Sequence, residues 1–173
     1  MGVTVDRHDT RTLALQPSLL DQLTDEEPRR QTDPPGAFLL GKDGLRAAVL
    51  RDLGWLMNAT RLGVTVPLEA WPEVERSVLN YGLPALAGAT ASTLDCQELE
   101  GAIRQAILRF EPRILPETLQ VAAMEAEPLP GGHNRVRLRI SGRIWARPVP
   151  LEMELRTELD LETGQVSLFA LTP

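Results

Sequence analysis

Few residues of this 173-residue chain have the types and spacing that enzyme chemistry requires. The two histidines, His8 and His133, lie outside any metal-ligand spacing such as H-E-x-x-H. The sequence contains no phosphate-binding G-x-x-x-x-G-K-[ST] loop, no G-x-G-x-x-G turn and no serine in a G-x-S-x-G context. We therefore expect no metal site, no cofactor and no serine nucleophile.

The single cysteine, Cys96, excludes an internal disulfide and any multi-cysteine metal site. A thiol mechanism would need a histidine partner for it. We interpret Cys96 as a buried or half-buried residue without a catalytic role, in a protein from a reducing compartment.

A pair of carboxylates is harder to exclude, because glycoside hydrolysis needs only two of them on either side of the substrate. The carboxylate in the most unusual setting is Glu111, which ends a predicted helix and precedes Pro112 and Arg113. A general acid must hold its proton near neutral pH, whereas a neighbouring arginine favours the charged carboxylate. We interpret Glu111 and Arg113 as a salt-bridged corner and a poor general acid.

The composition is that of an ordinary globular protein, with 43% apolar and 24% charged residues. The net charge of −6 repels phosphate and disfavours a nucleic-acid partner. No stretch approaches the roughly 18 consecutive apolar residues of a membrane span, and the N-terminal MGVTVDRHDT lacks the apolar region of an export signal. We expect a cytoplasmic protein without direct membrane insertion.

The first part of the chain, residues 1–36, is predicted to be a flexible tail that carries a short docking segment. Leu19, Leu20 and Leu23 give this segment an apolar face. Residues 24–36 follow it and combine charge and proline with almost no apolar side chains, as in an exposed linker. We therefore predict that the three leucines bind a partner rather than the protein's own core.

The rest of the chain, residues 37–173, is predicted to form a single domain with three helices in its first half. Apolar residues recur at three- and four-residue spacing along each helix. Asp43 is expected to be the N-cap of the first helix, and Gly82 is expected to end the second with left-handed backbone. The predicted helices cover residues 43–57, 72–81 and 93–109.

After Pro112 the apolar period changes from 3.6 to 2, which predicts strands. The predicted strands cover residues 119–123, 135–144, 151–160 and 166–170. Because the helices precede the strands, we expect an α+β fold with the N-terminal helices packed on one face of a C-terminal antiparallel sheet of three to four strands. The last strand is either an open edge, which could add a strand from a partner, or a closed hairpin strand.

Four arginines, at positions 135, 137, 139 and 143, alternate with apolar residues in the second predicted strand. An anion-binding face and a solvated face neutralised by the next strand both fit this pattern, and we favour the second. The preferred register sets Arg143 opposite Glu154, Arg139 opposite Glu158 and Arg137 opposite Asp160. A shift of two residues would instead place Arg139 opposite Arg156.

Four segments of the chain follow one another in a characteristic order. They are LLDQLTDEEP at 19–28, LRDLGWLMN at 50–58, SVLNYGLP at 77–84 and FEPRI at 110–114. Together they resemble the TssE proteins of type VI secretion systems, which are grouped with the T4-like phage baseplate wedge proteins and often labelled lysozyme-like. The resemblance extends over roughly residues 18–170.

The resemblance implies a structural wedge subunit of a six-fold baseplate, docked at the inner face of the inner membrane. It implies that the chain lies beside the wedge proteins TssF and TssG and helps the sheath subunits TssB and TssC to begin polymerising. The Glu-Pro-Arg motif is the signature of the family, so the resemblance implies partner-binding roles for Glu111, Pro112 and Arg113. The alternative is a peptidoglycan-cleaving, lysozyme-like glycoside hydrolase.

Overall fold

The computed structural model describes residues 17–24, 28–29, 32, 40–86, 95–124 and 134–171. Most of the predicted tail 1–36, with His8, and the loop that holds His133 lie outside these residues. The helices of the described part are α1 (Leu19–Leu23), α2 (Lys42–Met57), α3 (Pro72–Arg76) and α4 (Cys96–Phe110). The strands are β1 (Gln120–Ala123), β2 (Arg135–Ile144), β3 (Leu151–Asp160) and β4 (Val166–Ala170). The predicted α+β order is confirmed.

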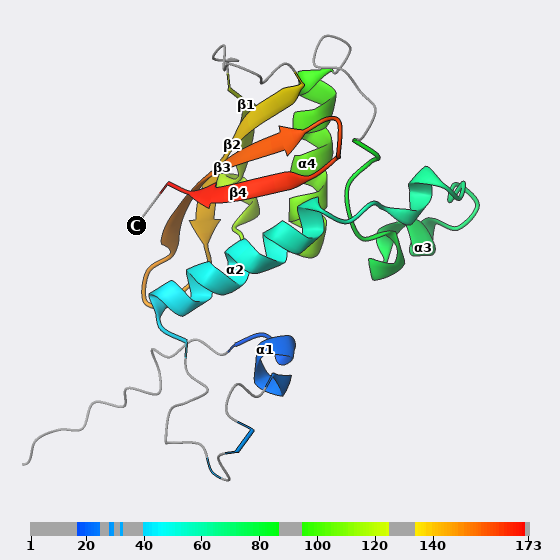
Figure 1. Cartoon of the computed structure of the whole chain (residues 1–173). Helices are drawn as coiled ribbons and strands as arrows, with labels where there is room; N and C mark the ends of the chain where they lie inside the picture. Colours follow the sequence, from blue (N-terminus) through cyan, green and yellow to red (C-terminus); the bar gives the residue numbers. More distant parts are fainter. Residues whose placement is uncertain are drawn as a thin grey trace, which may run out of the picture.

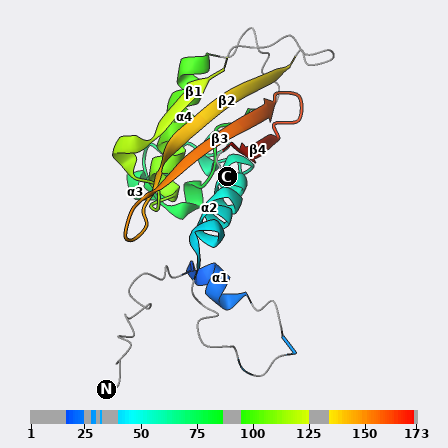
Figure 2. The same ribbon diagram turned by 90° about the vertical axis from the view of Figure 1, so that its left-hand side faces the viewer.

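The four strands form one antiparallel sheet in the order β1-β2-β3-β4. Helices α2 and α4 lie on one face of this sheet, and Figure 2 looks onto the opposite face, which no described helix covers. The bounds of β2, β3 and β4 agree with the predicted strands. They could be predicted because apolar and polar residues alternate in β2 and β3, and because β4 follows a clear turn at Thr163-Gly164.

The core lies between the two long helices and the inner face of the sheet. Leu53 of α2, Ile107 of α4 and Ile140 of β2 have no exposed surface. On α4 the buried side chains recur at three- and four-residue spacing, which turns one face of the helix to the sheet. Each side chain buried in this way stabilises the fold by about 1.5–3 kcal/mol. This layer holds the end of α4 in place against α2.

Each of the three predicted helices differs in some way from the one observed. The N-cap of α2 is Gly41 and not Asp43. Asp43 lies in the first turn, where its negative charge interacts favourably with the positive end of the helix dipole. The second predicted helix breaks at Ser77, whose extended backbone separates α3 from a 3-10 turn at Val78–Asn80. The Ser77 hydroxyl accepts a hydrogen bond from the Leu79 N–H at 3.2 Å and so competes with the continuous helix.

The start of α4 also differs from the prediction. Residue 93, where the helix is predicted to begin, lies outside the described residues. The helix begins at Cys96, because the Asp95 carboxylate accepts hydrogen bonds from the Gln97 and Glu98 N–H groups and acts as the N-cap. Cys96 is exposed at this end and not buried as expected.

The predicted register of β2 and β3 is wrong by two residues, and Arg139 lies opposite Arg156. A two-residue shift keeps every side chain on its own face of the sheet, so the buried residues cannot distinguish the two registers. Both arginines find partners elsewhere. The Arg139 Nε lies 3.5 Å from Glu154 Oε1, and the Arg156 guanidinium lies over the Phe169 ring, 5.4 Å from its centroid.

The uncovered face of the sheet is nevertheless neutralised by β3, as we favoured. Arg135 Nε lies 3.6 Å from Asp160 Oδ2, and Arg137 Nε lies 3.3 Å from Glu158 Oε1. Hydrogen bonds from the Thr163 and Glu162 N–H groups hold the pKa of the Asp160 carboxyl below its usual range. Such exposed pairs contribute little stability.

Candidate functional site

The Glu-Pro-Arg motif forms a sharp corner at the C-terminal end of α4. Glu111 is the C-cap residue, and its N–H still donates to the Ile107 carbonyl at 2.8 Å. Pro112 follows, cannot continue the helix and pushes Glu111 out of helical backbone. The chain then turns back, so that Arg113 lies beside Glu111. We call Glu111, Pro112 and Arg113 the corner.

The two charged side chains of the corner are joined in a forked pair. Arg113 Nε donates to Glu111 Oε1 at 2.6 Å, and Arg113 Nη2 donates to Glu111 Oε2. The main-chain N–H of Arg113 also donates to Oε1, at 3.2 Å. Only 3% of Glu111 is exposed. A buried carboxylate that accepts three hydrogen bonds, two of them from a guanidinium, has the partners that its burial demands.

The pair continues into a longer chain of alternating charges. Arg113 Nη2 also contacts Asp52 Oδ2 on α2, and Asp52 Oδ1 accepts hydrogen bonds from Arg51 Nε at 2.9 Å and Nη2 at 2.8 Å. Arg51 Nη1 in turn contacts Asp21 Oδ1 on α1. We call these five residues, from Glu111 through Asp52 to Asp21, the ion-pair chain. It joins three helices that are far apart in the sequence.

The electrostatics of the ion-pair chain favour fixed charges over proton transfer. The hydrogen bonds that Arg113 donates to Glu111 raise the pKa of Arg113 above its usual range. The hydrogen bond from Arg51 lowers the pKa of Asp21, and the same bond raises the pKa of Arg51. The structure therefore confirms the predicted salt-bridged corner.

Tyr81 lies next to the ion-pair chain and responds to its charge. Its hydroxyl donates to the Asp52 carbonyl at 3.4 Å, and its ring meets the Phe110 ring edge-on, with centroids 5.1 Å apart. Burial raises the pKa of Tyr81, and the charges of Asp52 and Glu111 raise it further.

The protein's only tyrosine can therefore report on the corner. The folded state favours the neutral phenol, so this contribution to stability is complete below about pH 10, the pKa of free tyrosine, and is lost as pH rises through the folded value. We expect the tyrosinate absorbance to titrate at higher pH in the folded chain than in urea. Glu111→Gln should lower the folded midpoint, because it removes one of the two charges. A folded midpoint at or below that in urea would contradict the assignment.

The predicted docking segment is a short helix on the surface. Ser18 and Asp21 form a capping box for α1, which explains why so short a helix is ordered. The exposed fractions of Leu19, Leu20 and Leu23 are 71%, 49% and 75%, so none of them belongs to the core. In both views α1 lies beyond α2, on the side away from the sheet (Figures 1 and 2).

The structure brings this helix and the corner together. A groove of about 400 Å³ lies between them. Its walls include Leu20 of α1, Trp55 of α2, Tyr81, and Pro112 of the corner. No local pattern in the sequence joins residues so far apart, and Asp21, Arg51 and Asp52 were not predicted as site residues. They do lie within the segments LLDQLTDEEP and LRDLGWLMN that carry the resemblance.

A comparison with protein families agrees with this architecture. The family model described as "Baseplate wedge protein gp25" matches residues 43–149, more than half of the chain. The chain belongs to this family. Searches of the curated proteins and of the solved structures found no match. The matched residues include α2, the corner and β2, so the family's shared region contains most of the ion-pair chain.

Membership of the baseplate wedge family indicates a structural role in a baseplate. No helix among the described residues is long and apolar enough to cross a membrane. The described residues also contain no cluster of three or more His, Cys, Asp or Glu side chains that could hold a metal ion.

The wedge domain ends its sheet with β4, which pairs only with β3 among the described strands. At one end of β4 the Asp160 N–H donates to the Gln165 carbonyl, and at the other end the Leu171 N–H donates to the Glu154 carbonyl. Between Gln165 and Leu171 the main-chain N–H and C=O groups of successive residues point alternately toward β3 and away from it. The main-chain groups of Val166, Leu168 and Ala170 therefore point away from β3.

A side chain already occupies one of these three outward positions. Asn58 Nδ2 donates to the Val166 carbonyl at 2.9 Å, and the Val166 N–H donates to Asn58 Oδ1 at 3.0 Å. The Asn58 amide thus takes the place of a neighbouring strand at this position. The outward groups of Leu168 and Ala170 remain as the part of the edge that a further strand could pair with.

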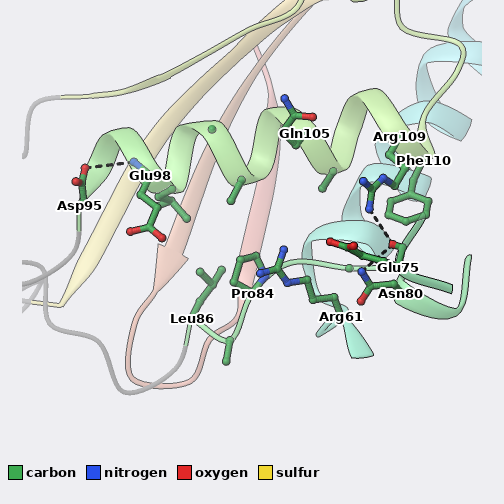
Figure 3. A pocket seen from close by; sticks show the side chains of 16 residues that line it. Arg61, Glu75, Asn80, Pro84, Leu86, Asp95, Glu98, Gln105, Arg109 and Phe110 are labelled. Atoms are coloured by element: carbon green, nitrogen blue, oxygen red, sulfur yellow. Dashed lines mark hydrogen bonds between the residues drawn. The ribbon is translucent and has the colours of Figure 1, made fainter. Parts of the chain in front are cut away.

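The wedge domain has a second hollow, of about 580 Å³, between α4 and the segment 61–86. Figure 3 shows Glu75, Asn80 and Arg109 at one end and Asp95 and Glu98 at the other. Arg109 Nη1 donates to the Glu75 carbonyl at 3.0 Å, and the buried Asn80 amide bonds the Glu75 carbonyl and the Gly63 N–H, both at 2.9 Å. These contacts hold the segment 61–86 together and attach it to α4.

Proposed function

We propose that this chain is a structural wedge subunit of a type VI secretion system baseplate. In this role it binds the wedge proteins TssF and TssG and helps the sheath subunits TssB and TssC begin to polymerise. It works in the cytoplasm, in a baseplate docked at the inner face of the inner membrane, and it has no enzymatic activity. The observation that carries the proposal is the buried, fully hydrogen-bonded corner in a chain of the baseplate wedge family.

We assign two roles to the three residues of the corner. Glu111 is buried and both of its carboxylate oxygens bond Arg113, so it positions the arginine. Pro112 is exposed, and 24% of the Arg113 side chain reaches solvent. A wedge partner then contacts Pro112 and the exposed edge of Arg113, while Glu111 acts through Arg113.

Two further surfaces complete the proposed function. Leu19, Leu20 and Leu23 bind a partner, which is supported by their exposure on α1. The outward groups of Leu168 and Ala170 pair with a strand of the first sheath layer, which is supported by the edge position of β4.

The proposal is tested by co-purification of the chain with TssF and TssG from cells that express all three. The wild type should be recovered with both proteins, and the Glu111→Ala/Arg113→Ala variant should be recovered with less of them. Arg76→Ala is the control, since it removes an exposed arginine of α3, outside the corner. Recovery that does not depend on the corner would assign Glu111 and Arg113 to internal packing.

The same preparation tests whether the chain cleaves peptidoglycan and whether β4 starts sheath assembly. Wild-type protein should leave the turbidity of a peptidoglycan suspension unchanged, and clearing without partner binding would favour the lysozyme-like hydrolase. Ala170→Pro removes one outward N–H from the edge with little change in side-chain volume, and Ala170→Ser keeps that N–H. Only the proline variant should fail to start a sheath, with binding to TssF and TssG unchanged. Sheath formation by both variants would refute the role of the edge.

A further inference from the structure

The leader helix α1 is held on the body of the protein mainly by charge. None of its residues is buried, and its five residues are too few to be stable alone. Asp21 nevertheless uses both carboxylate oxygens. Its Oδ2 accepts a hydrogen bond from the Ser18 hydroxyl at 2.7 Å, and its Oδ1 contacts Arg51 Nη1. One carboxylate thus shapes α1 and attaches it to α2.

The attachment point is shared with the corner. Asp52 lies in the middle of the ion-pair chain, with Oδ1 bonded to Arg51 and Oδ2 in contact with Arg113. The orientation of Arg51, which receives α1, is therefore linked through one carboxylate to the orientation of Arg113. A network of this kind responds as a unit when one member is removed.

The position of α1 also decides where its leucines point. Leu20 faces the groove with Trp55 and Pro112, and the Arg51 guanidinium lies 4.9 Å from the centroid of the Trp55 ring. Leu19 and Leu23 are separated by four residues, share one side of the helix and are 71% and 75% exposed. With α1 docked, Ser18 and Leu20 line the groove beside the corner, and Leu19 and Leu23 stay exposed on the same short helix.

We infer that Asp21 and Arg51 are a positioning pair that latches α1 onto the corner, so that Leu19, Leu23, Pro112 and Arg113 meet a wedge partner as one surface. This inference rests on the proposed function and adds a residue pair to it. Arg113, with 24% of its side chain exposed, is the charged member of this surface. The partner surface is accordingly aliphatic with an acidic side chain opposite Arg113.

The latch itself is tested in the full chain, without a partner, by a distance measurement. Spin labels are attached at Thr24→Cys and Gln105→Cys in a Cys96→Ser background, since all three positions are exposed. The unmodified pair should give one narrow distance distribution. Asp21→Lys should broaden it, because the lysine repels Arg51, whereas Gln22→Lys on the same helix should leave it narrow. A broad distance distribution in the labelled chain that keeps Asp21 would show that α1 is not held on α2, and it would overturn the inference.

The link between latch and partner is tested by binding of the same chain, without labels, to TssF and TssG. Asp21→Lys and Arg51→Gln should each weaken binding about two- to fivefold, in line with a partly exposed ion pair. The double variant should lose less affinity than the sum of the two single losses, because both substitutions remove the Asp21–Arg51 contact. Asp21→Glu should restore most of the affinity, and Gln22→Lys serves as the charge control.

Each outcome decides the inference. Tighter binding by Asp21→Lys would mean that α1 competes with the partner, and it would overturn the positioning role. Unchanged binding by Asp21→Lys, together with a broadened distance distribution, would overturn the positioning role as well. Absence of binding by the unmodified chain would overturn the proposed function together with its partner surface. The distance distribution would still report on the latch in that case, so the two failures are distinguishable.

Discussion

Arg113→Ala is expected to lower the free energy of unfolding by about 3–5 kcal/mol, because it leaves the Glu111 carboxylate buried without its counter-charge. Glu111 is 3% exposed and takes two of its three hydrogen bonds from the Arg113 side chain. Glu111→Ala should cost less, since Arg113 keeps its contact with Asp52. Urea denaturation followed by tryptophan fluorescence measures both changes.

The double replacement Glu111→Leu/Arg113→Met is the informative control. Apolar side chains of similar volume remove both buried charges at once, so most of the lost stability should return. Wedge binding should not return, because the exposed edge of Arg113 is gone. A cost below about 1 kcal/mol for Arg113→Ala would show that solvent already screens the pair, as at ordinary surface salt bridges.

Gly82→Ala is expected to destabilise the fold by about 2–5 kcal/mol, through backbone strain and overlap with the neighbouring main chain. Gly82 has φ of +119°, which L side chains rarely adopt. A Cβ at this position would lie 2.3 Å from the Ala59 carbonyl oxygen and 3.0 Å from the Arg61 nitrogen. Neither atom can move freely, because the Leu83 N–H donates to the Ala59 carbonyl at 2.8 Å and the Arg61 N–H donates to the Leu83 carbonyl at 2.9 Å.

Gly101→Ala provides the opposite expectation within the same protein. Gly101 lies inside α4, and no atom lies within 4 Å of an added Cβ. Alanine there should stabilise the fold by about 0.5–1 kcal/mol, because it favours helical backbone. Thermal denaturation of the two variants side by side gives both signs. Equal and small effects would mean that the segment around Gly82 yields to the added atom.

The sequence was informative where one local pattern decides the outcome. The bounds of β2 and β3 followed from alternation, and β4 followed from the turn before it. The corner followed from the effect of Pro112 on Glu111. The break at Ser77 was missed, because a side-chain cap competes with a helix that Pro72 and Gly82 otherwise delimit well. Alternation also left the register of β2 and β3 undecided, since both registers bury the same residues.

The ion-pair chain could not be predicted for a different reason. Asp and Arg are common at ordinary surface positions, so residue type does not single out Asp21, Arg51 and Asp52. Their pairing depends on how α1, α2 and α4 are arranged in space. Asp21 and Arg51 are 30 positions apart, and Asp52 and Arg113 are 61 positions apart. Opposite charges at such separations produce no periodic pattern in the sequence. Only the resemblance singled out the segments that contain them, and it did so without assigning them a role.

The Asn58 amide on Val166 affects how the wedge domain meets other chains in a crowded cell. An exposed strand edge of five residues would accept many chance partners, including further copies of the same chain. With the first position closed, an incoming strand can align only with the far end of β4. In the proposed edge pairing, one strand would thus add at a defined offset, and the closed position would disfavour the indiscriminate stacking that produces fibrils.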